Sequence, residues 1–354
     1  MTHDEARGMF PVLERFAYLN AGTFGPLSRG VMQAVAVDQR RDLEDGRLGA
    51  AYFERMIALR GGLRAQIAAL VAAEPGQVAV TASTTDGCNI VLAGLDLRAE
   101  DEIVTTTDEH FGLLGPLHAS GARVIVTAPD PDVILAAVTP RTKLIAISHV
   151  LWTTGQILPV RELRERSGVP ILVDGAQSVG AVPVDAAGLD FLTVSGQKWL
   201  CGPDATGALV VADPERLRVG RPGYFAQASY EPDGTFIPRE GAQRFEPNWI
   251  PVSSLSGLAV ALTQAPAWHF ERSYALAERL RGLLAGRAEV VTPAERATLV
   301  AFRPPASASA SDTVARLGTA SVLVREVPGT GLIRASVGWW TSEGDLERLV
   351  VGLG

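Results

Sequence analysis

Between residues 77 and 212, short runs of valine, isoleucine and leucine alternate with segments of helix length. Several of these runs are almost uninterrupted, which is typical of strands that helices cover on both faces. Repetition of strand and helix predicts an α/β fold with a largely parallel sheet, whose ligands bind at the carboxyl ends of the strands. The runs expected to form the sheet are Val78–Thr81, Ile103–Thr106, Val124–Thr127, Leu144–Ser148, Ile171–Val173, Phe191–Val194 and Ala208–Val211.

The segments on either side of this sheet divide the chain further. Its 354 residues are enough for two domains. We expect an irregular lead-in at 1–30, a large domain at 31–250 and a smaller α+β domain at 251–354. Residues 221–250 are rich in Gly, Pro and aromatic residues, which predicts a long connection bordering the site. The Ala/Ser run at 306–311 predicts a surface loop.

Charge and cysteine content argue against several classes of protein. Lys plus Arg number 32 and Asp plus Glu 39, a net charge of −7, which disfavours a broad nucleic-acid-binding face or an anionic-membrane anchor. We expect no signal peptide and no membrane-spanning segment. Cys88 and Cys201 form neither a CxxC pair nor a disulfide framework, so a reducing, cytoplasmic location is expected. The five histidines show no HExxH motif and no pairing with cysteine, so no metal site is predicted.

Lys198 lies at a chemically unusual place in this pattern. It follows the apolar run Phe191–Val194 and precedes a Gly/Pro-rich turn and a second apolar run. A lysine at the carboxyl edge of a buried strand is costly unless it has a task. One such task is a Schiff base to pyridoxal phosphate (PLP), which needs an amine of lowered pKa. The alternative is a surface lysine after an edge strand.

Polar residues follow three other predicted strands. Residues 83–87 place small hydroxyl side chains at the start of a helix, where they either bind an anion or simply cap the helix. His110 either stacks on a flat heteroaromatic ring or caps a loop. Asp174 ends a buried strand, which is unfavourable unless donors or a cation such as a protonated pyridine nitrogen meet it; the alternative is an Asp that starts a turn. Gln177 then follows within reach of a phenolate oxygen.

Taken together, these motifs resemble those of the class V aminotransferase family of fold-type I PLP enzymes. The family includes cysteine desulfurases, C–S lyases and isopenicillin N epimerase-like proteins. The resemblance covers roughly residues 18 to 345 and implies a mostly parallel seven-stranded sheet, PLP as cofactor, a small amino-acid substrate and a homodimer. The matching motifs, in family order, are STTDG (83–87), DEHFG (108–112), SHVLWTTGQILP (148–159), VDGAQSVGAVPVD (173–185) and SGQKWLCGP (195–203).

The resemblance also implies roles for individual residues. Lys198 would be the Schiff-base lysine, Asp174 the partner of the pyridine nitrogen, Gln177 a contact of the ring oxygen and His110 the stacking residue. Thr84, Thr85, Ser195 and Gln197 would hold the phosphate, although the position of Gln197 is often His in the family. Arg334 would bind the substrate carboxylate, since a guanidinium matches a carboxylate in two bonds; the alternative is a salt-bridged strand residue. Trp152 would contact the substrate.

Within this family the motifs are most similar to those of cystine C–S lyases. The segment 324–331 holds no cysteine, and Trp152 stands where desulfurases tend to carry Asn, so a persulfide-forming desulfurase is disfavoured. Pro247-Asn248-Trp249 replaces the family's Gly-Thr-Pro, whose Thr reaches a neighbouring subunit's phosphate. From the similarity to cystine C–S lyases we predict β-elimination on cysteine, cystine or an S-substituted cysteine. The alternatives are a PLP-dependent aminotransferase or amino-acid epimerase, and a non-catalytic α/β binding protein.

Overall fold

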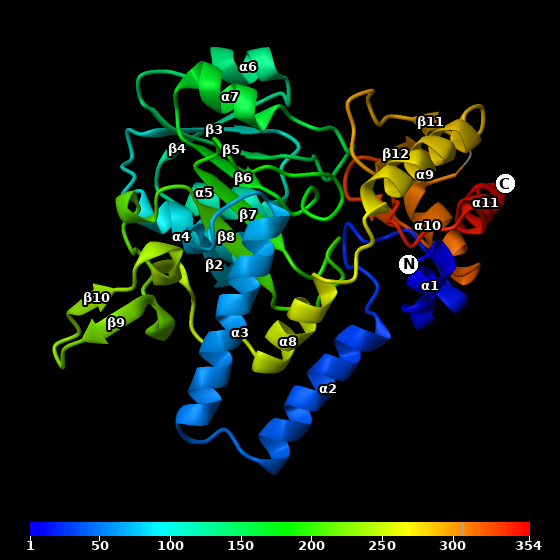
Figure 1. Cartoon of the computed structure of the whole chain (residues 1–354). Helices are drawn as coiled ribbons and strands as arrows, with labels where there is room; N and C mark the ends of the chain where they lie inside the picture. The colour runs from blue at the N-terminus through cyan, green and yellow to red at the C-terminus, as the bar shows by residue number, and fades with distance from the viewer. Residues whose placement is uncertain (306–307) are drawn as a thin grey trace.

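The computed structural model describes residues 1–305 and 308–354, and its large unit is built on a seven-stranded sheet (Figure 1). The strand order is β2-β8-β7-β6-β5-β3-β4, and only β8 runs antiparallel to its neighbours. The predicted fold class, a mostly parallel sheet flanked by helices, is therefore confirmed. The strands are β2 (Val78–Thr81), β3 (Glu102–Thr106), β4 (Arg123–Thr127), β5 (Thr142–Ser148), β6 (Ile171–Asp174), β7 (Phe191–Ser195) and β8 (Gly207–Val211).

Helices bury the two faces of this sheet, which explains why its strands are so uniformly apolar. In β5, Leu144 and Ala146 pack toward α4 and α5, whereas Ile145 and Ile147 pack toward α3, α6 and α7. Successive side chains of a strand point to opposite faces, so both halves of the run must be apolar. These helices are α3 (Gly49–Leu70), α4 (Thr84–Gly94), α5 (Phe111–Ala119), α6 (Pro131–Ala136) and α7 (Val160–Ser167).

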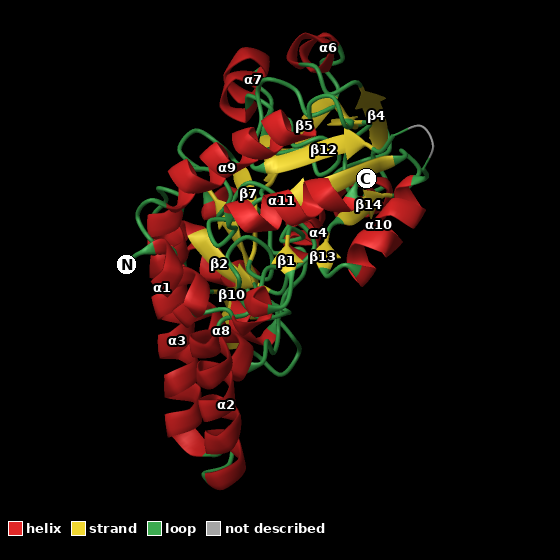
Figure 2. Ribbon diagram, turned by 90° about the vertical axis from the view of Figure 1, so that its right-hand side faces the viewer, coloured by secondary structure: helices red, strands yellow, loops and turns green. Residues whose placement is uncertain are grey.

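The C-terminal unit has its own four-stranded antiparallel sheet, in the order β11-β12-β15-β14, and its own core. Figure 2 shows β12 and β14 of this sheet. The N-terminal lead-in packs onto this unit, because β1 (Ala17–Tyr18) pairs in parallel with β13 (Val322–Leu323). The remaining elements of the unit are β11 (Glu289–Val290), β12 (Leu299–Arg303), β14 (Arg325–Val327), β15 (Leu332–Ser336), α1 (His3–Gly8), α9 (His269–Leu284), α10 (Ala310–Thr319) and α11 (Glu343–Gly352).

The packing of α8 (Val252–Ala261) differs from the expected domain division. This helix lies between α2 (Arg29–Glu44) and α3 (Figure 1), and its Leu255 and Leu258 share a core with Leu63 and Val80 of the large unit. The apolar pattern of α8 revealed a helix but not the face on which it packs. We therefore propose that the boundary of the small domain lies between α8 and α9 rather than at residue 251.

Two other expectations concern loops. The connection at 221–250 contains an antiparallel hairpin that was not predicted, formed by β9 (Gln227–Tyr230) and β10 (Phe236–Pro238), which projects from the large unit (Figure 1). In the Ala/Ser run, residues 306 and 307 lie outside the described residues, and α10 begins at Ala310. In the part of the chain that the structure describes, no helix combines the length and the apolar character that a membrane crossing requires.

Candidate active site

A cavity of about 290 Å³ lies at the carboxyl ends of the central strands. Loops after five strands of the large sheet meet there with the N-terminal lead-in and with β14 and β15 of the small unit. Apart from Asp174, every residue predicted for the site lines this cavity. The lining residues are Gly22, Thr23, Phe24, Ser83, Thr84, Thr85, His110, Trp152, Gln177, Ser195, Gln197, Lys198, Arg325 and Arg334.

Lys198 presents its amine to this cavity from the loop that follows β7. Burial lowers the pKa of the amine to about 8; Asp174 acts in the opposite direction, and the guanidinium of Arg334 lowers the pKa further. The chain has only one other lysine, Lys143, which is exposed at the far end of β5. Lys198 is therefore the one lysine suited to act as a nucleophile or base near neutral pH.

Asp174 ends β6, directly beside β7, and is 3% exposed. Its Oδ1 accepts hydrogen bonds from the amide of Ala176 (2.9 Å) and the hydroxyl of Thr193 (3.4 Å). Among the described residues it has no ion-pair partner. Its charge influences the pKa values of both Lys198 and His110, which places the carboxylate next to the cavity. A buried carboxylate that lacks a protein cation suits a ligand that carries one.

The opposite end of the cavity is suited to an anion. Helix α4 begins at Thr84, and Ser83 caps it by accepting the amide of Asp86 (3.1 Å). The predicted capping role of this segment and its predicted anion-binding role are compatible, because the first amides of a helix point outward past the cap. At the end of β7, whose Ser195 pairs with Gly207 beside Ser83, the hydroxyl of Ser195 donates to Oε1 of Gln197 (3.0 Å).

His110 has the capping role that the sequence offered, and its ring also lies in the cavity. It is the N-cap of α5, where Nδ1 accepts the amide of Gly112 (3.0 Å), so the ring proton belongs on Nε2. The ring also faces the cavity and meets Trp152 edge to face, with centroids 5.2 Å apart. Burial, followed by the charge of Lys198, lowers the pKa of His110, which keeps the ring neutral.

Arg334 lies almost completely buried on β15, at 1% exposure. Its Nη1 donates to the carbonyl of Trp152 (2.9 Å), its Nη2 lies 3.3 Å from the hydroxyl of Thr23, and its Nε has no partner. Burial lowers the pKa of Arg334 to about 9, and neighbouring Arg325 adds to the effect. Arg325 also contacts the Thr23 hydroxyl (3.1 Å). Over residues 1–305 and 308–354 neither guanidinium pairs with a carboxylate, so the alternative of a salt-bridged strand residue is wrong for Arg334.

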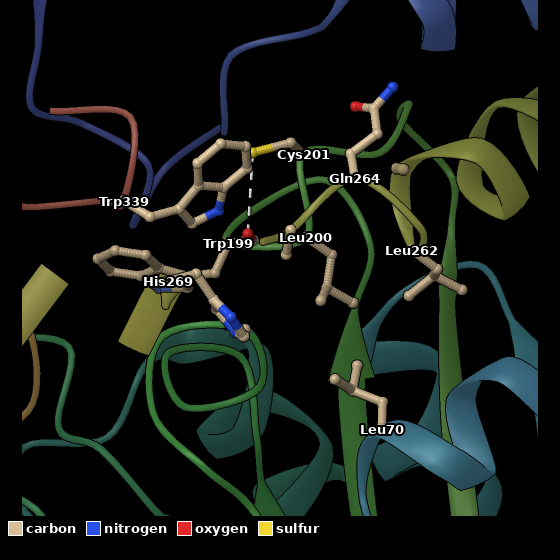
Figure 3. A pocket seen from close by; sticks show the side chains of 11 residues that line it. Leu70, Trp199, Leu200, Cys201, Leu262, Gln264, His269 and Trp339 are labelled. Atoms are coloured by element: carbon tan, nitrogen blue, oxygen red, sulfur yellow. Dashed lines mark hydrogen bonds between the residues drawn. The ribbon is translucent and has the colours of Figure 1, made fainter. Parts of the chain in front are cut away.

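Gln177 is held by protein contacts on both sides of its amide. Its Nε2 donates to the carbonyl of Gly22 (2.8 Å), and its Oε1 accepts the indole N–H of Trp199 (3.0 Å). One amide hydrogen remains for a ligand. Trp199 and Cys201 border a second cavity of about 140 Å³ on the other side of this loop (Figure 3). Cys201 and Cys88 are both buried, in agreement with their predicted packing roles.

Sequence reasoning missed two residues of the region and misplaced one segment. Arg325 lines the cavity, but a strand arginine carries no local signal of a site. Glu109 is buried next to His110, which lines the cavity. It belongs to the motif DEHFG, but only His110 of that motif was predicted to be a site residue. No residue of 221–250 lines the cavity within one chain, so the expectation that this connection borders the site is wrong for the monomer. The described residues contain no group of His, Cys, Asp and Glu that could hold a metal.

The mixed seven-stranded sheet flanked by helices, with a buried lysine in the cavity at the carboxyl ends of its strands, is the architecture of a fold-type I PLP enzyme. The chain belongs to the class V aminotransferase family, whose model matches residues 51–349. Because this is a family of PLP-dependent enzymes, the alternative of a non-catalytic binding protein is set aside.

Several individual relatives match over nearly their whole length. Isopenicillin N epimerase of Streptomyces clavuligerus is 28% identical over 395 residues, which cover 99% of this chain and 97% of the relative. A cysteine desulfurase of Klebsiella pneumoniae (strain 342) is 29% identical over 412 residues, with coverage of 99% and 97%.

Among solved structures, the cystine C–S lyase C-DES in complex with its reaction product, cysteine persulfide, has a TM-score of 0.91 and 27% identity. That match covers 97% of this chain and 98% of the other. A C-DES mutant with glycine covalently linked to the PLP cofactor matches with the same score and identity.

Proposed function

We propose that this protein is a PLP-dependent C–S lyase that performs β-elimination on an L-cysteine derivative, foremost cystine. The products would be pyruvate, ammonia and a thiol or persulfide. The observation that carries the proposal is the composition of one cavity, which combines an amine of lowered pKa with two guanidinium groups that lack carboxylate partners. Its similarity to C-DES over nearly the whole chain supports the same reaction.

The residues of the cavity fit PLP. We propose that Lys198 binds the aldehyde, Asp174 faces the ring nitrogen, His110 lies over the ring and Gln177 meets the ring oxygen. Thr84, Thr85, Ser195 and Gln197 would hold the phosphate at the start of α4. When bound, PLP supplies an electron sink for the pair released at the substrate Cα. The unpaired carboxylate of Asp174 is the feature of the chain that favours a protonated ring nitrogen.

The remaining groups bind the substrate and move its proton. Arg334 would hold the α-carboxylate through its guanidinium and so fix the direction of the Cα–H bond. The Lys198 amine, with a pKa of about 8, can accept the Cα proton near neutral pH. Trp152 lines the same cavity, and its indole N–H is buried without a partner, so it is a free donor for the substrate. Loss of the proton and cleavage of the Cβ–S bond release the sulfur with its electron pair.

Arg325 narrows the substrate class. It and Arg334 both contact the hydroxyl of Thr23, so two cations lie close together, and neither pairs with a carboxylate of the residues that the structure describes. Like charges held together in a partly buried site favour a ligand with more than one anionic group. Cystine has a second carboxylate beyond the reacting carbon, whereas cysteine does not. We therefore propose that Arg325 meets the distal carboxylate of cystine.

The fate of the sulfur follows from the positions of the two cysteines. Neither Cys88 nor Cys201 lines the cavity, and burial raises the pKa of both thiols well above the ordinary value. A buried neutral thiol is a poor nucleophile, so the chain offers no acceptor for a protein-bound persulfide. The sulfur would leave on a small molecule, in contrast to a desulfurase.

Epimerisation is the second candidate, and the 28% identity to isopenicillin N epimerase over nearly the full length favours it. A proton would then return to the opposite face of Cα from a second donor, instead of a group leaving from Cβ. An aminotransferase would use the same cofactor residues and require a keto-acid acceptor.

A direct assay separates these reactions. The protein loaded with PLP is incubated with cystine, cysteine and S-methylcysteine without any keto acid, and pyruvate is measured. The proposal expects pyruvate from cystine at the highest kcat/KM. No pyruvate from any of the three, together with inversion of an amino acid or product only when a keto acid is added, would contradict it.

We further propose that the enzyme is a cytoplasmic homodimer. The large unit exposes several aromatic side chains. Tyr224, Tyr230 and Trp249 are each more than half exposed. Tyr224 stacks on Trp249 with centroids 6.3 Å apart. Exposed aromatic clusters of this kind are usually covered by a partner. The two free cysteines suit a reducing compartment.

A further inference from the structure

Glu109 is a buried carboxyl group that none of the steps above employs. It follows β3 and is 5% exposed. Both of its oxygens lie 3.0 Å from the amide of Ser148, which donates to them, and Oε2 also accepts the Ser148 hydroxyl. Oε1 accepts the hydroxyl of Thr106 at 2.9 Å. The group therefore joins the loop after β3 to the end of β5.

These two loops carry the aromatic pair of the cavity. His110 directly follows Glu109, and Trp152 lies four residues beyond Ser148, where the two rings meet edge to face. A second bond joins the same two loops, since the Thr153 hydroxyl donates to Asp108 (3.1 Å). The position of the His110 ring relative to Trp152 is thus set by two ties between the loops, one through Glu109 and one through Asp108.

We propose that Glu109 is a positioning residue of the active site, which fixes the His110–Trp152 pair over the cavity by tying the β3 loop to the end of β5. The inference rests on the proposed binding of PLP in this cavity. Without the bonds of Glu109, His110 would lie on an untied loop and its ring would change rotamer more freely. Burial raises the pKa of Glu109 to about 7, a sign of how completely the group is enclosed.

The test compares two buried carboxyl groups at opposite ends of β3, Glu102 at its start and Glu109 in the loop that follows it. Glu109→Gln keeps the size of the side chain but turns an amide NH₂ toward donors, which breaks at least one of the four hydrogen bonds. Glu102→Gln is the matched control, since Glu102 is 2% exposed at the other end of β3, where it binds Arg141 and Thr139 far from the cavity. Both variants are measured as the PLP-loaded enzyme.

The readouts are the visible circular dichroism of the bound cofactor, without substrate, and kcat. Glu109→Gln is expected to reduce the dichroism at least about twofold and kcat by roughly 10- to 100-fold, because small displacements of positioning groups are costly. Glu102→Gln is expected to change neither, while lowering the melting temperature. Equal effects of the two variants, or no effect of Glu109→Gln on either readout, would overturn the proposal.

A milder variant covers the case in which Glu109→Gln does not fold. Ser148→Ala removes one hydroxyl donor and leaves the charge and the backbone amide bonds in place. It is expected to reduce the dichroism and kcat in the same direction, by a smaller factor, and unchanged values of both would count against the proposal. The dichroism requires only bound PLP, so a protein that binds PLP without eliminating cystine would defeat the proposed reaction and still test Glu109.

Discussion

Two regions of this molecule bury arginines, and they treat the charge in opposite ways. Arg60 and Arg64 of α3 both bind Glu246, at 2.6 and 2.8 Å, and Arg60 also lies 4.4 Å from the Phe225 ring centroid. In the cavity, the equally buried Arg334 donates to a carbonyl and a hydroxyl and lies 6.0 Å from the Trp152 ring centroid, and among the described residues it meets no carboxylate.

The difference separates structure from function. A buried cation matched by a carboxylate of the protein is complete and holds segments together, here α3 and the end of the 221–250 connection. A buried cation left without a carboxylate raises the energy of the empty protein and is worth keeping only where a ligand supplies the missing charge. Burial alone therefore does not identify an active site, whereas burial together with an unmatched charge does.

The largest effect is expected when the carboxylate is removed from the cluster of Arg60, Arg64 and Glu246. Glu246→Ala leaves Arg60 buried with no counter-charge, so the free energy of unfolding should fall by about 3–5 kcal/mol. Urea denaturation of the purified protein measures the change. The control is Glu162→Ala, which breaks an exposed pair with Arg166 and should cost less than about 1 kcal/mol. Similar losses for the two variants would show that the buried cluster is not a structural element.

The next largest effect is expected when the guanidinium of Arg334 is removed from the cavity. Arg334→Met leaves no carboxylate unpaired and removes only the donor to the Trp152 carbonyl, so the free energy of unfolding should change far less than in Glu246→Ala. The value of kcat/KM for cystine should fall by roughly 10- to 150-fold, which corresponds to about 1.5–3 kcal/mol for bonds to a charged group. Steady-state kinetics and a melting curve are measured together.

Arg325→Met is the companion variant of Arg334→Met. It should lower the preference for cystine over cysteine by roughly tenfold with little change for cysteine itself, on the scale of one weaker charged contact. If Arg334→Met destabilised the protein as strongly as Glu246→Ala, the contrast between the two regions would disappear.

The last prediction concerns the slope of the free energy of unfolding against pH. The amine of Lys198 has an ordinary pKa of 10.5 and a folded pKa of about 8, so between these values the unfolded chain holds a proton that the folded cofactor-free protein has released. Stability of the wild type should therefore rise with pH relative to Lys198→Met, by about 1 kcal/mol per pH unit at most. Lys198→Met should be the more stable protein at pH 7, and the gap should narrow toward pH 10. A gap that is constant with pH would mean that the amine is not buried.

The sequence predicted the sheet and the cofactor residues for a physical reason. Strands buried on both faces must be apolar throughout, and residues such as Asp174 and Lys198 stand out because they end such strands. The sequence also predicted that residues 83–87 lie at the start of a helix, and α4 begins at Thr84 with Ser83 as its cap.

What could not be predicted depends on contacts between distant segments. Arg325 reaches Thr23 across 302 residues, and Glu109 reaches Ser148 across 39, so no local pattern marks either one. The apolar stripe of α8 likewise gave no sign that its partners are α2 and α3.

The central claim is that the Lys198 amine binds the aldehyde of PLP. The direct test is reduction of the PLP-loaded protein with borohydride, followed by digestion and mass spectrometry of the labelled peptide. The chain has only two lysines, so the result has few outcomes, and Lys198→Ala, which retains Lys143, is the control. The account predicts a pyridoxyl group on Lys198 alone and none in the variant. A label on Lys143, or equal labelling of the variant, would contradict it.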